Sequence, residues 1–281
     1  APANPPAVTE THGAANGAWQ NKVKDLAFTW PAGSDDRSGL AGYFVYFGKD
    51  AAGTAATWTT SPSYDPAVIT SQGAFYLRIQ TKDNAGNTSA WVTLFTLMFD
   101  SIAPTNPTVT SSGHTPGAWA HDNTIDVSWA NAADASSGVK GYSIVWNQTP
   151  TTLPDTVMDS TATAATSAAL ADGSGYYFHL RTLDNAGNWS ATAVHFGPIQ
   201  IDTVAPTAPT TVVEAGNIPS NTWQRWNGNA NFTWSGAADA LSGVSGYFYY
   251  WGPSDTGTAT DFTTAAAFDP PAYTTTRFYY L

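Results

Sequence analysis

One pattern recurs about every hundred residues along this chain, and it limits the architecture more than any other feature. Each copy has a Trp, an Asp five residues later, a Ser-Gly pair and then Gly-Tyr, always at the same spacing. The copies begin at Trp30, Trp129 and Trp234. A period of this length is typical of an array of whole domains rather than of a solenoid built from short motifs. We therefore expect three similar domains, at residues 1–102, 103–204 and 205–281.

The composition permits a packed core in each repeat and disfavours several classes of partner. Aromatic residues make up 14% of the 281 residues, whereas charged residues make up 11%, against about 25% in ordinary proteins. The net charge is −11 with only ten Lys and Arg, so we expect no nucleic-acid partner. The absence of Cys excludes disulfides and thiolate metal sites. No apolar run is long enough to span a membrane in this segment.

Alternating apolar residues predict the strands. In the first repeat they read Leu26-x-Phe28-x-Trp30, Tyr43-x-Val45-x-Phe47 and Phe75-x-Leu77-x-Ile79, and the last of these matches Phe178-x-Leu180-x-Thr182 in the second repeat. A period of two with aromatic and β-branched residues is typical of half-buried strands. No segment shows a helical period with caps. The fold class is therefore all-β, with many short strands in each repeat, which favours a β-sandwich.

A turn motif follows the third of these strands. It reads Asp83-Asn84-Ala85-Gly86-Asn87 in the first repeat and Asp184-Asn185-Ala186-Gly187-Asn188 in the second. Together with the Trp strand, the Gly-Tyr strand and the aromatic strand, it resembles the bacterial fibronectin type III-like, immunoglobulin-like tandem repeat domains of cell-surface or secreted proteins. The resemblance implies tandem immunoglobulin-like β-sandwiches, and it says little about function.

The repeats are joined by similar short linkers. These run from Asp100 to Pro104 and from Asp202 to Pro206. Proline fixes its own φ and keeps the preceding residue extended, so we expect stiff linkers. The third repeat is incomplete because it stops before the turn and the closing strand. We expect either that the chain continues past Leu281 or that another chain donates the missing strand, since exposed sheet edges are normally avoided.

No pattern in the chain indicates catalysis, so we expect no enzymatic activity and no required cofactor. The five histidines have no metal-ligand spacing, and neither a nucleophile elbow nor a phosphate-binding glycine loop occurs. Asp35, Asp134 and Asp239 recur at one position of the repeated pattern. We expect them to cap a turn through hydrogen bonds to the backbone.

Calcium is the cofactor that the family resemblance implies. Related bacterial surface arrays bind calcium at domain junctions, and four aspartates recur near the domain ends: Asp83, Asp100, Asp184 and Asp202. Calcium needs several carboxylate and carbonyl oxygens that converge on one point. The alternative is that Asp83 and Asp184 order the hairpin turn while Asp100 and Asp202 cap the linkers. Both interpretations stay open at the level of sequence.

Strand alternation also predicts an outward face rich in aromatic residues. This predicted interaction surface consists of Phe44, Tyr46, Tyr76, Arg78, Phe248, Tyr250 and Tyr280. Such a face can pack against another protein or stack on sugar rings. The alternative is that a connecting loop covers it.

Taken together, these features favour a non-catalytic, extracellular structural array of a prokaryotic cell-surface protein. We expect a filament, a surface layer or an adhesin stalk, with copies of the same chain as partners in an assembly. The alternative is a carbohydrate-binding or spacer region of a secreted polysaccharide-degrading enzyme, with glycans as partners. A carbohydrate-binding role requires an aromatic platform that has polar neighbours and stays exposed to solvent.

Overall fold

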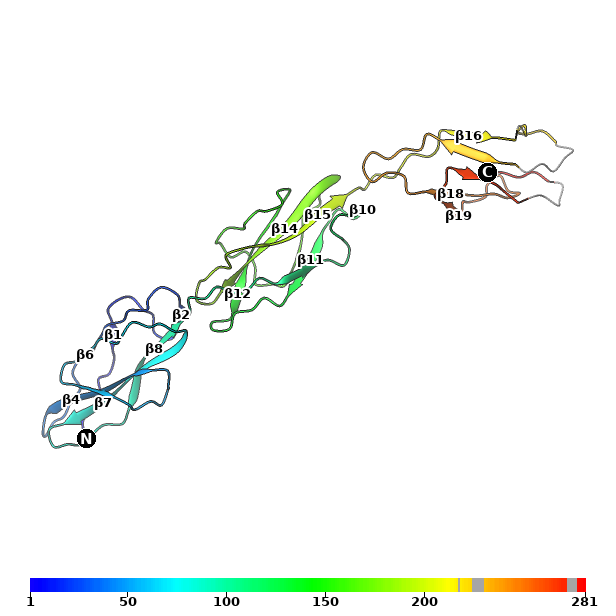
Figure 1. The fold of residues 1–281 in the computed structure, drawn as a ribbon. Helices are drawn as coiled ribbons and strands as arrows, with labels where there is room; N and C mark the ends of the chain where they lie inside the picture. Colours follow the sequence, from blue (N-terminus) through cyan, green and yellow to red (C-terminus); the bar gives the residue numbers. More distant parts are fainter. Residues whose placement is uncertain (217, 224–229, 272–276) are drawn as a thin grey trace. The chain divides into compact units, whose positions relative to one another are not determined.

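In the part of the chain that the computed structural model describes, every regular element is a β-strand (Figure 1). The structure describes residues 1–216, 218–223, 230–271 and 277–281. Within these ranges, no helical segment has the length and apolarity needed to cross a bilayer. The chain separates into two compact units, one of residues 1–116, 125–168 and 175–199 and the other of residues 117–124, 169–174 and 200–281.

The first repeat is built from a small and a large sheet. The small sheet has the order β1 (Thr9–Glu10), β3 (Phe28–Thr29), β6 (Ser63–Tyr64). The large sheet has the order β2 (Trp19–Gln20), β8 (Val92–Phe99), β7 (Gly73–Asp83), β4 (Leu40–Gly48), β5 (Thr57–Thr59). All pairings are antiparallel except that of β2 with β8.

The core of the first repeat lies between the inward faces of these sheets. Side chains along β7 alternate between buried and half-buried, as period-two patterning predicts. Phe28 of the small sheet meets Phe95 of the large sheet with ring centroids 5.2 Å apart. Trp30 packs edge-on against Tyr43 at 5.6 Å. The Trp and the Tyr of the repeated pattern are therefore core partners.

The second repeat has the same plan. Its small sheet has the order β13 (Ala164–Thr166), β11 (Asp126–Ala130), β9 (Thr108–Thr110). Its large sheet has the order β10 (Trp119–Ala120), β15 (Val194–Ile201), β14 (Gly173–Asp184), β12 (Val139–Asn147). Trp129 packs edge-on against Tyr142 at 5.3 Å, as Trp30 does against Tyr43.

In the third repeat the structure describes a small sheet and a hairpin. The sheet has the order β16 (Thr211–Glu214), β17 (Phe232–Ser235), β20 (Ala267–Phe268), and the hairpin joins β18 (Tyr247–Tyr249) to β19 (Asp261–Thr263). Trp234 and Tyr247 again pack edge-on, at 5.3 Å. The prediction of an all-β tandem array of sandwiches is thus confirmed, whereas the exact domain boundaries remain a prediction.

One predicted correspondence between repeats is wrong by two residues. Phe47 pairs with Leu77, and Trp146, which holds the same place in the second repeat, pairs with Phe178. Phe178 therefore matches Leu77 and not Phe75. A shift of two residues keeps every side chain on its own face of the sheet, so alternation alone does not detect it.

Candidate functional site

The linker aspartates Asp100 and Asp202 each accept two backbone hydrogen bonds. In Asp100, which is fully buried, Oδ1 accepts from the N–H of Ile102 at 3.0 Å and Oδ2 from the N–H of Ser137 at 3.1 Å. In Asp202, Oδ1 accepts from Val204 at 3.2 Å and Oδ2 from Ser242 at 3.0 Å. The Ser242 contacts come first among the causes that lower the pKa of Asp202. Each linker is thereby attached to the Ser-Gly turn of the repeat that follows it.

The aspartate of the repeated pattern caps that Ser-Gly turn. Asp134 Oδ1 accepts from the N–H groups of Ser136, Ser137 and Gly138 at 3.1, 2.8 and 2.8 Å. Gly138 has φ of 77°, a value that suits glycine. Burial raises the pKa of Asp134, but the hydrogen bonds from the turn outweigh it and hold the pKa below the usual 3.8. The predicted turn-capping role of Asp134 is therefore confirmed, and Asp35 has the same contacts.

The aspartate of the hairpin motif orders its own turn. Asp184 accepts from the N–H of Asn188 at 2.8 Å and from its side-chain Nδ2 at 2.7 Å. Asp83 makes the same two contacts with Asn87, and the side-chain hydrogen bond is the main cause that lowers the pKa of Asp83. The repeated Asp-Asn-Ala-Gly-Asn turn thus has a local structural explanation.

Three of these carboxylates come together in the first compact unit. Oxygens of Asp100, Asp134 and Asp184 all lie within 4.8 Å of one another. Asp100 and Asp184 are buried and Asp134 is half-buried. Carboxylate oxygens are the donors that calcium prefers, so these residues could hold that ion. The same three carboxylates accept the hydrogen bonds described above, so calcium at this cluster stays a prediction.

The structure brings together only two of the four calcium candidates. Asp100 and Asp184 belong to the cluster, whereas Asp83 and Asp202 do not. Asp134 was missed as a ligand because its turn-capping role explained its recurrence. The signal that could have found it is the constant spacing between the Asp-x-x-Ser-Gly turn and the linker that precedes it.

Within the predicted interaction surface, Tyr46 and Arg78 hold a loop rather than face open solvent. The Tyr46 hydroxyl accepts from the N–H of Asp50 at 3.0 Å, and a Cβ on Gly53 would lie 2.2 Å from the Tyr46 ring. Arg78 Nη1 donates to the carbonyl of Gly53 at 2.9 Å. Its guanidinium also lies over the Trp91 ring at 5.8 Å. The loop that follows β4 therefore covers part of this face, and Tyr76 beside it is half-buried.

Phe44 has an aromatic partner that the sequence analysis did not include. Trp58 of β5 lies opposite Phe44 of β4, with ring centroids 4.9 Å apart. The Trp58 side chain is 42% exposed. Its correspondence with Phe262 of the third repeat was the signal that could have identified it.

The third repeat carries a similar pair in the same register. Phe248 of β18 lies opposite Phe262 of β19 at 5.2 Å, and these side chains are 70% and 52% exposed. Tyr250 packs under the following loop, as Tyr46 does, and its hydroxyl accepts from Ser254 at 3.2 Å. Tyr280 is 39% exposed and forms an isolated antiparallel β-bridge with Gly252.

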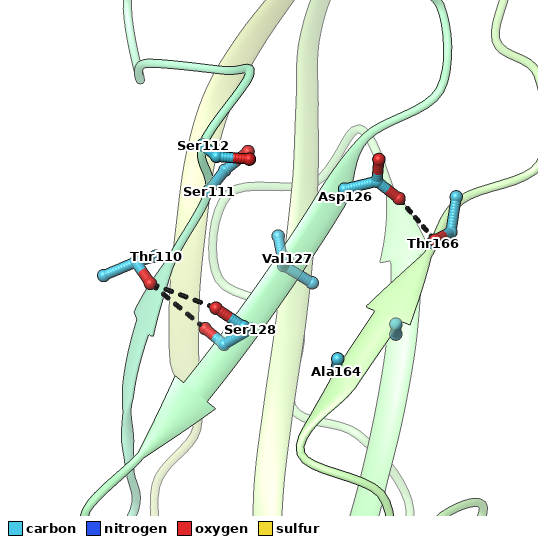
Figure 2. Close-up of a pocket in the computed structure, with 9 residues that line it drawn as sticks. Thr110, Ser111, Ser112, Asp126, Val127, Ser128, Ala164 and Thr166 are labelled. Atoms are coloured by element: carbon cyan, nitrogen blue, oxygen red, sulfur yellow. Dashed lines mark hydrogen bonds between the residues drawn. The ribbon is translucent and has the colours of Figure 1, made fainter.

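A shallow hollow also lies on the small sheet of the second repeat (Figure 2). Thr110, Asp126, Ser128 and Thr166 line it with hydroxyl and carboxylate groups. These groups already pair with each other, since Thr166 donates to Asp126 and the hydroxyls of Thr110 and Ser128 lie 3.3 Å apart. No aromatic ring is among its described lining residues.

Comparison with known proteins finds one matching domain family and several similar enzymes. Residues 103–196 match the family model of the fibronectin type III domain. Exoglucanase B of Cellulomonas fimi is 29% identical over 247 residues, which cover 84% of this chain and 21% of that enzyme. Chitinase A1 of Niallia circulans is 33% identical over 192 residues, which cover 66% and 24%. Fibronectin(III)-like modules of Clostridium thermocellum CbhA match with a TM-score of 0.31 and 13% identity, covering 68% of this chain and 94% of that one.

These comparisons correct the function expected from sequence. This chain spans about a quarter or less of the length of the curated relatives it matches. The relatives are named as an exoglucanase and a chitinase, not as filament, surface-layer or adhesin proteins. The prediction of a structural array in a cell-surface filament, surface layer or adhesin stalk is therefore wrong. It failed because a tandem array by itself does not distinguish these settings.

Proposed function

Because this chain is a tandem array of fibronectin type III-like β-sandwiches, we propose that it is a non-catalytic spacer region of an extracellular polysaccharide-degrading enzyme. The chemistry of that enzyme resides in another part of the protein. Glycans are the proposed partners, and self-association is a separate prediction that no comparison supports.

One observation carries this proposal. The same stretch resembles parts of an exoglucanase and of a chitinase, and it covers 21% and 24% of those two proteins. Enzymes named for different polysaccharides share this region. A region shared in this way is suited to a task that does not depend on which glycosidic bond is cleaved.

The roles of the carboxylates agree with a mechanical task. Among the described residues, the recurrent aspartates accept backbone hydrogen bonds in turns and linkers. A glycosidase needs two carboxyl groups that face a substrate across a cleft. Asp100 and Asp184 are instead buried at a junction, where they fix the local chain path.

The attachment of each linker to the next turn supports a spacer with restrained joints. Asp100 contacts Ser137, and Asp202 contacts Ser242. Since the prolines of the linkers also restrict the backbone, the joints differ from flexible Gly/Ser tethers. A spacer of this kind holds other domains apart instead of letting them collapse onto one another.

The test is deletion of residues 1–281 from the full-length parent protein. We expect hydrolysis of a soluble oligosaccharide to keep its kcat, while hydrolysis of insoluble polysaccharide falls several-fold. The isolated chain should hydrolyse neither substrate. A parent protein that lacks any glycoside-cleaving activity, or an isolated chain that shows turnover, would refute the proposal.

A further inference from the structure

We infer that the Phe44–Trp58 pair is a stacking platform for a glycan of β-linked pyranose rings, repeated as Phe248–Phe262 in the third repeat. This inference rests on the proposed function, because it names the ligand class that the spacer contacts. We call these two pairs the aromatic platforms.

The first platform is held in place by the strand backbone. Trp58 lies on the edge strand β5, directly across from Phe44 on β4. A Cβ on Gly42 would lie 2.7 Å from the Trp58 ring carbon Cζ2, so the ring occupies the space that a side chain would fill. The ring therefore packs directly against the backbone at Gly42, and 42% of the side chain remains exposed to solvent.

Polar groups adjoin this platform on the same outward face. On β7, Gln80 pairs with Phe44, and Lys82 pairs with Gly42. The ammonium of Lys82 lies 5.9 Å from the centroid of the Trp58 ring. Pyranose rings present apolar C–H groups on their faces and hydroxyls around their edges. The Gln80 amide already donates to the carbonyl of Ser89 at 2.8 Å. The Trp58 ring can meet the C–H faces, and the Lys82 ammonium that lies over this ring can meet the hydroxyls.

The second platform repeats this geometry within the third repeat. Phe248 and Phe262 face each other in the same register, at 5.2 Å. Gly246 holds the place of Gly42, and a Cβ there would lie 2.4 Å from the Phe262 ring. Among the described residues, these two side chains are 70% and 52% exposed.

The second repeat shows that the fold does not require an aromatic pair at this place. There Ser143 replaces Phe44, and its hydroxyl bonds to Asp155 and Asp159. The Met158 side chain lies over Gly141, as the Trp58 ring lies over Gly42 in the first repeat. Cross-strand aromatic pairs stabilise the pairing of the two strands that carry them. In the second repeat, which lacks the pair, the segment opposite β12 forms only the isolated bridge of Tyr142 with Ser160 and no strand like β5.

The second repeat also supplies the variant for the experiment. In the full 281-residue chain, Phe44→Ser with Trp58→Met and Phe248→Ser with Phe262→Met place the residues of the second repeat at both platforms. These substitutions reproduce side chains that the fold already accommodates. Met158→Ala in the second repeat is the matched control, because Met158 holds the place of Trp58 in a repeat that has no aromatic platform.

Binding is measured by depletion on regenerated cellulose and on insoluble chitin, with cellohexaose and chitohexaose followed by NMR. We expect the unmodified chain and the Met158→Ala control to bind equally. The platform variant should bind about tenfold more weakly, since each lost ring contact contributes about a factor of two to ten. Circular dichroism shows whether each variant is folded, and Trp58→Phe should keep most of the binding.

Two results would overturn the inference. The first is an unmodified chain that binds none of the four probes, and the second is a folded platform variant that binds as well as the control. Neither result affects the spacer proposal, because deletion of residues 1–281 from the parent enzyme tests that separately.

Discussion

The Asp100 carboxylate accepts a hydrogen bond from the backbone N–H of Ser137, at 3.1 Å. Ser137 also donates to Asp134, the residue that caps its own turn, at 2.8 Å. One N–H group is therefore shared between the linker and the turn of the following repeat. Asp202 and Ser242 form the equivalent contact at 3.0 Å. The strongest sequence signal in the chain, the Asp-x-x-Ser-Gly motif, is thus part of a joint as well as of a turn.

Asp100→Asn should destabilise the first compact unit. The substitution keeps the shape of the side chain but replaces one acceptor oxygen with a donor, which opposes the N–H of Ser137 or Ile102. We expect a loss of about 1–3 kcal/mol in the free energy of unfolding, because a buried donor loses its partner. Urea unfolding of the full chain measures it. Asp36→Asn, at an exposed position beside the first Ser-Gly turn, is the control and should have little effect. Equal stability of the two variants would contradict the role of this contact.

Calcium should raise the melting temperature if it occupies the Asp100–Asp134–Asp184 cluster. A ligand that binds only the folded state stabilises it in proportion to the logarithm of its concentration above the Kd. Calorimetry in excess calcium and in excess chelator provides the measurement, with magnesium for comparison. Asp134→Asn should abolish the shift, whereas Asp36→Asn should leave it intact. Identical melting curves in calcium and in chelator would contradict calcium binding by this cluster.

Protonation of His179 should make the second repeat less stable in mild acid. His179 is fully buried; its Nδ1 lies 2.7 Å from Nδ1 of His195, and its Nε2 lies 3.1 Å from Oδ1 of Asn147. Burial, followed by repulsion from His195, lowers the pKa of His179 below the usual 6.5. The unfolded chain therefore takes up a proton at a higher pH than the folded chain does. Stability is complete above pH 6.5 and falls as the pH drops from there to the lowered folded value.

Hydrogen exchange in β14 and β15, measured at several pH values, tests this prediction. His179→Gln should flatten the pH dependence in this window, because no imidazole remains to be protonated at that position. His121→Gln changes an exposed histidine and should keep the dependence of the unmodified chain. If His179→Gln keeps the original slope, the effect has another source.

Gly42→Ala should destabilise the hairpin that carries the first platform. Gly42 has φ of 153°, and an added Cβ would lie 2.6 Å from the carbonyl oxygen of Thr59 and 2.7 Å from the Trp58 ring. We expect a cost of about 1–3 kcal/mol, typical of overpacking, together with displacement of Trp58. Gly113→Ala is the control, since an added Cβ there meets nothing within 4 Å. Thermal unfolding and the NMR signal of the Trp58 indole report the two effects. An unshifted indole signal would show that the Trp58 ring does not pack against Gly42.

The local motifs and the fold class were predictable from sequence because both depend on short-range chemistry. The Asp134 cap and the Asp184–Asn188 turn each depend on residues within four positions of one another. The strands were predictable because aromatic and β-branched residues alternate along them. The two-residue error between Phe178 and Phe75 arose because a shift by a full period of the strand leaves the pattern unchanged.

The platforms and the carboxylate cluster depend on pairings between distant segments. Trp58 faces Phe44 only because β5 pairs with β4 in one particular register. Asp134 meets Asp100 only because the linker folds back onto the next turn. Composition and periodicity contain neither register nor loop path, so these neighbours became visible only in the structure.

The contact between linker aspartate and turn serine has a consequence for how such chains grow. The aspartate lies at the end of one repeat, and the serine lies in a motif that every repeat carries. A duplicated copy inserted at this boundary brings both halves of the contact with it. Evolution can therefore lengthen or shorten the array by whole units, without inventing a new interface at each insertion.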